Sequence, residues 1–154
     1  MISRGPMPGA LQHMRVRAGE YQATFTVPPA RASQFASALL GAGAGAAGAR
    51  LVVDAAVFPP THLQTALGNG DAEAWLDAET VIEAESGEAE ALLIAALQDW
   101  TDFWFVPIPG GFLLYGDNHE NATLFAHRKD LVAGAADALR AAGFDEVDDY
   151  VREL

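Results

Sequence analysis

The stretch WTDFWFVPIPGGFLLYGDNHENATLF, residues 100–125, contains half of the chain's aromatic residues. Within it, residues 103–107 have the composition of a strand, and residues 112–115 and 123–127 flank a polar turn. Two β-rich segments around a turn of Gly, Asp and Asn are typical of a β-hairpin. The aromatic density marks the core. The stretch therefore predicts the sheet on which the rest of the chain packs.

Upstream of this stretch, strand and helix patterns alternate. Residues 21–27 and 51–58 are predicted strands, and a helix opened by Pro28 and Pro29 and closed by a run of glycines lies between them. One or two helical turns are expected over residues 61–67. Residues 79–85 predict a third strand with one acidic, exposed face. Ser86 is the expected cap of the next helix, whose apolar stripe consists of Leu93, Leu97 and Trp100.

Downstream, two more helices are expected. The first covers residues 130–142 and stops at Gly143. The second covers residues 145–154, where apolar side chains recur on one helical face: Val147, Tyr150, Val151 and Leu154. The predicted fold class is therefore α+β, with a mostly antiparallel or mixed sheet and helices packed on one face. This is a ferredoxin-like type of sandwich.

Length and composition limit the class of protein. The 154 residues are 51% hydrophobic, enough for one cored domain, which we place at residues 19–154 after a flexible N-terminal tail over residues 1–18. Because cysteine is absent, disulfides, thiolate metal sites and cysteine nucleophiles are excluded. The longest apolar run, residues 91–97, is too short to cross a bilayer, and the N-terminal residues lack the order of a secretory signal. A cytoplasmic protein is expected.

Charge is distributed very unevenly along the chain. The formal net charge is −12, and no lysine or arginine occurs between Arg50 and Arg128. Such a chain repels nucleic-acid backbones and anionic membranes, and it can attract a basic protein. A plainer interpretation is that the acidic surface only maintains solubility. We therefore expect no nucleic-acid or membrane partner.

The first functional hypothesis is a protein-binding module that masks a basic surface on a partner, as an inhibitor, immunity-type protein or adaptor does. Its binding residues would be the carboxylates around the third predicted strand: Asp71, Glu73, Asp77, Glu79, Glu83 and Glu85. No catalytic motif is present, so we expect a binding protein rather than an enzyme. A homodimer joined through the aromatic-rich sheet is compatible with this function.

The alternative hypothesis is a small enzyme or a ligand- or metal-binding domain built on the hairpin turn. Asp117, His119 and Glu120 lie close together in the sequence, and His127 stands at the end of the returning strand. Imidazoles and carboxylates could hold a divalent metal, or His119 could act as a base oriented by Asp117. The same residue types also occupy ordinary exposed turns. No other cofactor is expected.

Two further features leave alternatives open. Asp54 lies within an apolar strand, so it needs a partner or carries a raised pKa if its face is buried, and it has no special role if the face is open. The glycines from Gly43 to Gly48 match the spacing of a dinucleotide-binding loop, but they follow a predicted helix and precede a strand. That order favours a plain connector. His62, in a proline-bounded loop, is interpreted as incidental.

Overall fold

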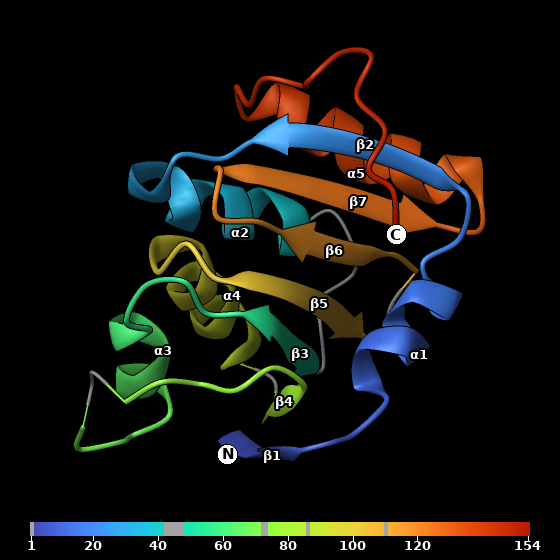
Figure 1. The fold of residues 1–154 in the computed structure, drawn as a ribbon. Helices are drawn as coiled ribbons and strands as arrows, with labels where there is room; N and C mark the ends of the chain where they lie inside the picture. Colours follow the sequence, from blue (N-terminus) through green and yellow to red (C-terminus); the bar gives the residue numbers. More distant parts are fainter. Residues whose placement is uncertain (1, 42–47, 72–73, 86, 110) are drawn as a thin grey trace.

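The computed structural model of the chain describes residues 2–41, 48–71, 74–85, 87–109 and 111–154. Seven strands occur in this described part: β1 (Ile2–Pro6), β2 (Tyr21–Thr26), β3 (Gly48–Ala55), β4 (Thr80–Glu85), β5 (Asp102–Ile108), β6 (Leu113–Gly116) and β7 (Asn121–Ala126). They form one antiparallel sheet in the order β1-β4-β3-β5-β6-β7-β2 (Figure 1). The predicted α+β class, with its hairpin of β6 and β7, is confirmed.

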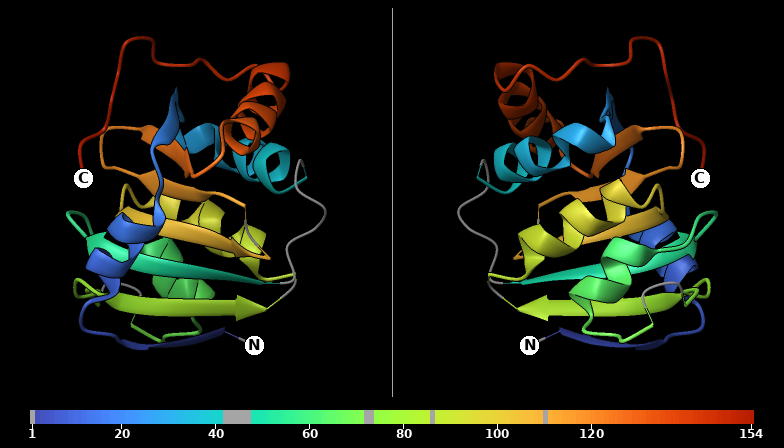
Figure 2. Two further views of the ribbon diagram at one scale, coloured as in Figure 1. Left: turned by 90° about the vertical axis from the view of Figure 1, so that its right-hand side faces the viewer. Right: turned by 90° about the vertical axis from the view of Figure 1, so that its left-hand side faces the viewer.

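Helices cover both faces of this sheet, but unequally. The helices of the described chain are α1 (Ala10–Arg17), the 3-10 turn η1 (Pro29–Arg31), α2 (Ala32–Gly41), α3 (Thr61–Ala66), α4 (Ala89–Gln98) and α5 (Lys129–Ala141). As predicted, α2, α3, α4 and α5 share one face, whereas α1 lies on the other (Figure 2). None of these described helices is long and apolar enough to cross a bilayer.

The core has two layers because the central strands are buried on both faces. In β5, Phe103 and Phe105 belong to the larger core under α2 to α5, and Trp104 between them belongs to the core under α1. The Trp104 ring packs against Tyr115 and Phe125, with centroid distances of 5.0 and 5.5 Å. A strand buried on both faces is a continuous apolar run. This explains the aromatic density of residues 103–107.

The N-terminal residues differ from the expected flexible tail over residues 1–18. β1 pairs antiparallel with β4, and α1 packs on the sheet through Ala10 and the fully buried Met14. Apart from that stripe, the helix sequence is rich in Arg, Gln and His. The apolar stripe is so narrow that the sequence pattern does not indicate a packed helix.

The helix predicted over residues 145–154 is wrong, because Asp145–Leu154 form no helix. The segment pairs with β2 instead: Thr26 N–H donates to Asp145 O at 3.0 Å, and Val147 N–H donates to Thr24 O at 2.8 Å. β2 is an edge strand with free backbone groups, and pairing with it outweighs the local helical pattern. The predicted apolar stripe is consequently open to solvent, with Val151 71% and Leu154 53% exposed.

Some predicted features fall on residues that the structure does not describe, and the predicted acidic face of β4 is confirmed only in part. Ser86, the expected helix cap, and glycines 43 and 45 lie outside the described residues. On β4, Glu83 and Glu85 are exposed as predicted, but Val81, which precedes them on the same face, is buried in the core under α1. The unforeseen α1 is the reason that this face is not wholly acidic.

Candidate functional site

Antiparallel pairing brings four chain segments to one end of the sheet, on the left in Figure 1. Ala55 at the end of β3 pairs with Asp102 at the start of β5. Gly116 at the end of β6 pairs with Ala122 near the start of β7. We call this region the acidic end, and it comprises five carboxylates: Asp54, Asp99, Asp102, Asp117 and Glu120.

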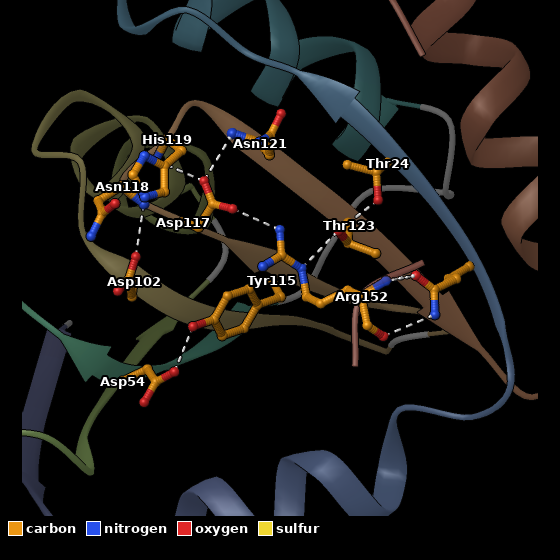
Figure 3. A network of polar contacts seen from close by, with 11 residues as sticks. Thr24, Asp54, Asp102, Tyr115, Asp117, Asn118, His119, Asn121, Thr123 and Arg152 are labelled. Carbon is orange, nitrogen blue, oxygen red and sulfur yellow. Dashed lines mark hydrogen bonds and ion pairs between the residues drawn. The ribbon is translucent and has the colours of Figure 1, made fainter. Parts of the chain in front are cut away.

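At the acidic end, the half-buried Asp54 has a hydrogen-bond partner, which is the outcome expected for a buried strand face. The Tyr115 hydroxyl donates to Asp54 Oδ2 at 2.5 Å (Figure 3). Burial raises the pKa of Tyr115 above its ordinary value, and the hydrogen bond and negative charge of Asp54 raise it further. The phenol therefore stays protonated and serves as a hydrogen-bond donor rather than as a base.

Asp102 lies next to this pair. Its Oδ1 accepts the backbone N–H of Asn118 at 2.7 Å. Burial raises the pKa of Asp102, the hydrogen bond from Asn118 opposes this, and the nearby Asp117 and Asp54 carboxylates raise it again. These three carboxylates thus interact electrostatically although they come from different strands or turns.

Asp117 is held in the hairpin turn and bound by an arginine from the C-terminus. Its Oδ1 accepts the N–H groups of His119 at 2.8 Å and Asn121 at 3.0 Å. Its Oδ2 accepts a hydrogen bond from Arg152 at 2.8 Å. Arg152 Nε also donates to Thr123 Oγ1 at 2.9 Å (Figure 3). Arg152 could not be found from the sequence pattern because it lies 35 residues from Asp117 along the chain.

The predicted hairpin cluster is only partly brought together. Asp117, His119 and Glu120 lie in the same turn, but His127 follows the opposite end of β7. Six residues at about 3.3 Å each separate the two ends by about 20 Å. Within the described ranges, no group of three or more His, Cys, Asp or Glu side chains could hold a metal ion. The Asp117 carboxylate bonds to the backbone of its own turn, as aspartate commonly does in structural turns, and also to Arg152.

The carboxylates of the first hypothesis are placed around β4 and the loop before it. Glu79 Oε2 accepts the N–H of Leu11 in the first turn of α1 at 3.3 Å, where a carboxylate favours the helix dipole. Glu83 forms an ion pair with Arg50 at 2.9 Å. Asp71, Asp77 and Glu85 are exposed, and Glu73 lies outside the described residues. At least two of these carboxylates therefore support the fold.

Asp99 is a buried group that sequence analysis did not single out. It is 4% exposed, and its carboxylate accepts the N–H groups of His62 at 3.0 Å and Leu63 at 2.9 Å. The His62 ring is joined to it as well, with Nδ1 2.7 Å from Oδ1. These N–H groups belong to the first turn of α3, and Pro60 before them provides no side-chain cap. Asp99 thus caps α3 from the end of α4.

An exposed aromatic pair adjoins this cap. Phe58 and Trp100 are 50% and 39% exposed, and their ring centroids are 5.8 Å apart. Trp100 was predicted on the buried stripe of α4. That helix ends at Gln98, and Trp100 has a left-handed backbone with φ of 51°. The pair therefore stands at the surface, and Trp100 directly follows Asp99, the residue that binds His62.

The acidic end thus combines mutually bonded polar groups with two exposed aromatic rings. In the described part of the chain, its phenol is held protonated and Asp117 is already bound, so the arrangement suits recognition better than nucleophilic chemistry. The chain matches no protein-family model, and no curated protein or solved structure is significantly similar to it.

Proposed function

We propose that this protein is a binding module for a basic segment of another protein, and that the acidic end is its contact surface. The observation that carries the proposal is the exposed Phe58 and Trp100 pair at the acidic end, where Trp100 directly follows Asp99. Inhibitor, immunity-type protein and adaptor are the roles in which a small module masks a basic surface. A cytoplasmic setting belongs to the same proposal.

The aromatic pair would supply most of the binding energy. Large aromatic side chains at the centre of an interface are typical energetic anchors, each costing about 2 kcal/mol or more when truncated to alanine. The Phe58 and Trp100 rings contact each other, which limits their freedom before binding. A partner that covers them therefore orders few new side-chain rotations.

The surrounding charge would select the partner. Residues 51–127 contain no lysine or arginine, and this range includes all five carboxylates of the acidic end. Complementary charge raises the rate of association and discriminates against acidic partners. Salt screens such interactions over about 8 Å at physiological ionic strength. Association is therefore expected to weaken as salt increases, through the rate of association more than the rate of dissociation.

The test begins by capturing partners of the full-length chain at low salt, eluting them with salt, and identifying them by mass spectrometry. The affinity of an identified basic protein is then measured for variants. Phe58→Ala and Trp100→Ala should each weaken binding by about 30-fold, corresponding to about 2 kcal/mol. Tyr21→Ala is the matched control, because Tyr21 is also an exposed aromatic but pairs with Ala126, away from the acidic end.

Charge reversal separates the two candidate acidic surfaces. If Phe58→Ala and Trp100→Ala bind like the unaltered chain, the acidic end is not the contact surface. If combined reversal of Glu79, Glu83 and Glu85 then abolishes binding in a variant that unfolds at the same urea concentration as the unaltered chain, the surface around β4 is the contact instead. If no basic protein binds the unaltered chain at low salt, the proposed function itself is wrong.

A further inference from the structure

The C-terminal segment, Asp145–Leu154, lies against the sheet without forming a helix, and its pairing with β2 is followed by a turn at which Asp149 has a φ of 55°. It runs along the edge strand β2 and crosses to the face that carries α1 (Figures 1 and 2). Besides its backbone pairing with β2, it is held by Gln22, whose side chain accepts from the N–H of Arg152 at 2.7 Å and donates to its carbonyl at 3.2 Å. Peptide-binding proteins hold a bound peptide in the same way, through hydrogen bonds to its backbone. The side chain of Arg152 makes a separate set of contacts.

The Arg152 side chain fills a site built from β6, β7 and the turn between them. The guanidinium lies 4.7 Å above the ring of Tyr115, donates from one edge to Asp117, and donates from Nε to Thr123 (Figure 3). The side chains of Arg152 and Asp117 are each only 12% exposed. An aromatic face below a planar cation, with a carboxylate at its edge, is specific chemistry for a guanidinium.

The walls of this site are held by bonds that do not involve Arg152. Tyr115 is bonded to Asp54, Asp117 accepts two backbone N–H groups of its own turn, and Thr123 shares a hydrogen bond of 2.8 Å with Thr24. The shape of the site is therefore determined by the sheet. A different arginine would meet the same walls.

The segment that carries Arg152 is weakly anchored. Its contacts with the sheet are mainly polar, and the hydrogen bonds of Arg152 to Gln22, Thr123 and Asp117 are part-buried rather than deep in the core. Its apolar side chains Tyr150, Val151 and Leu154 are exposed, so little hydrophobic burial holds it down. Competition at this site is consequently feasible at moderate ligand concentrations.

We propose that the site formed by Tyr115, Asp117 and Thr123 recognises arginine, that Arg152 occupies it in the free chain, and that an arginine of a bound protein segment replaces Arg152. The source of that arginine rests on the proposed function, since it names a basic partner. The C-terminal segment then acts as an internal competitor. It excludes weak arginine ligands and is displaced by a partner that also binds elsewhere on the acidic end.

The experiment uses the full-length chain and the acetylated pentapeptide Tyr-Val-Arg-Glu-Leu, the sequence of residues 150–154. Binding is measured by calorimetry and by NMR shifts of Thr123 and Asp117. Arg152→Ala empties the site and should bind the peptide at least 10-fold more tightly than the unaltered chain. A peptide with lysine in place of arginine should lose that gain, because lysine lacks the planar fork.

Three further variants make the result decisive. Adding Asp117→Asn to Arg152→Ala should remove the gain. Arg128→Ala is the control, because Arg128 is exposed and pairs with Asp130 outside the site. Gln22→Ala removes the two hydrogen bonds to the backbone of Arg152 and leaves Tyr115, Asp117 and Thr123 unchanged. It should also raise peptide affinity, and it replaces Arg152→Ala in the test if that variant does not fold.

The proposal is overturned if folded Arg152→Ala and Gln22→Ala bind the peptide no better than the unaltered chain, or if the gain survives Asp117→Asn. The assay uses neither a natural partner nor Phe58 and Trp100. Failure here would therefore leave the proposed function standing, and loss of the proposed function would leave this result intact.

Discussion

Removing the Asp99 carboxylate should destabilise the protein more than any other single truncation at the acidic end. Asp99→Ala deprives the N–H groups of His62 and Leu63 of their acceptor. Losing a helix cap costs about 0.5–2 kcal/mol, and leaving a buried donor without a partner costs about 1–3 kcal/mol. Because Leu63 is fully buried, water cannot replace this acceptor. We expect a loss of about 2–4 kcal/mol in the free energy of unfolding.

Two companion variants separate the bonds that Asp99 makes. Asp99→Asn retains an acceptor oxygen and should lose about 1 kcal/mol. His62→Ala removes only the ring contact, which is half exposed, and should also lose about 1 kcal/mol or less. The measurement is urea unfolding followed by tryptophan fluorescence, with the slope against urea used to check that unfolding stays two-state. For a chain of this size, Asp99→Ala should lower Tm by roughly 4–16 °C.

A change of less than about 0.5 kcal/mol in the free energy of unfolding of Asp99→Ala, the usual effect of a neutral surface substitution, would show that Asp99 is not a stabilising cap. The reasoning is also refuted if His62→Ala costs as much as Asp99→Ala. That result would mean that the imidazole contact, rather than the cap of α3, is what stabilises this region.

Other predictions concern the sheet and its polar network. Burial raises the pKa of Asp102, so the folded chain keeps this proton to higher pH than the unfolded chain and loses stability as pH rises from 3.8 through the folded value. The stability of Asp102→Asn relative to the unaltered chain should therefore increase over that window in urea unfolding, and a constant difference would contradict this. Tyr115→Phe leaves Asp54 without its phenol donor and should cost about 1 kcal/mol by the same assay, whereas a stabilised variant would argue against the bond. Gly9→Ala and Gly19→Ala both place alanine at φ near 85° at a cost of about 1–2 kcal/mol, but at Gly19 the new methyl group would lie 2.4 Å from a backbone carbonyl. Gly19→Ala should therefore lose about 1–3 kcal/mol more in thermal unfolding, and equal losses would show that the close approach is easily relieved.

Local sequence pattern was sufficient for the elements whose partners are near in the chain. The β6–β7 hairpin follows from two apolar runs around a polar turn, and α5 follows from its apolar periodicity with Gly143 at its end. The continuous aromatic run of β5 likewise indicated a strand at the centre of the core. In these elements, the hydrogen bonds and the buried face are both determined within a few residues.

The candidate site was predicted less well, because its contacts join distant residues. The sequence pattern indicated Asp117 as a site residue but not Arg152. His62 was predicted to be incidental, although Asp99 binds it across 37 residues. Asp54 was predicted to need a partner only if its strand face is buried, and nothing in its neighbourhood identified Tyr115, 61 residues away. Periodicity indicates which face of a strand is buried, and it does not indicate which strand lies beside it.

The sequence by itself determined the α+β class, the acidic charge and most helices and strands, since these depend on composition and on spacings of two to four residues. Tertiary structure alone decided that β1 pairs with β4, that Asp145–Leu154 follows an edge strand rather than forming a helix, and that Arg152 fills a site on the sheet. In these cases, the free energy of pairing with distant backbone or burying a side chain exceeds the weak local preference, and only the complete fold supplies those partners.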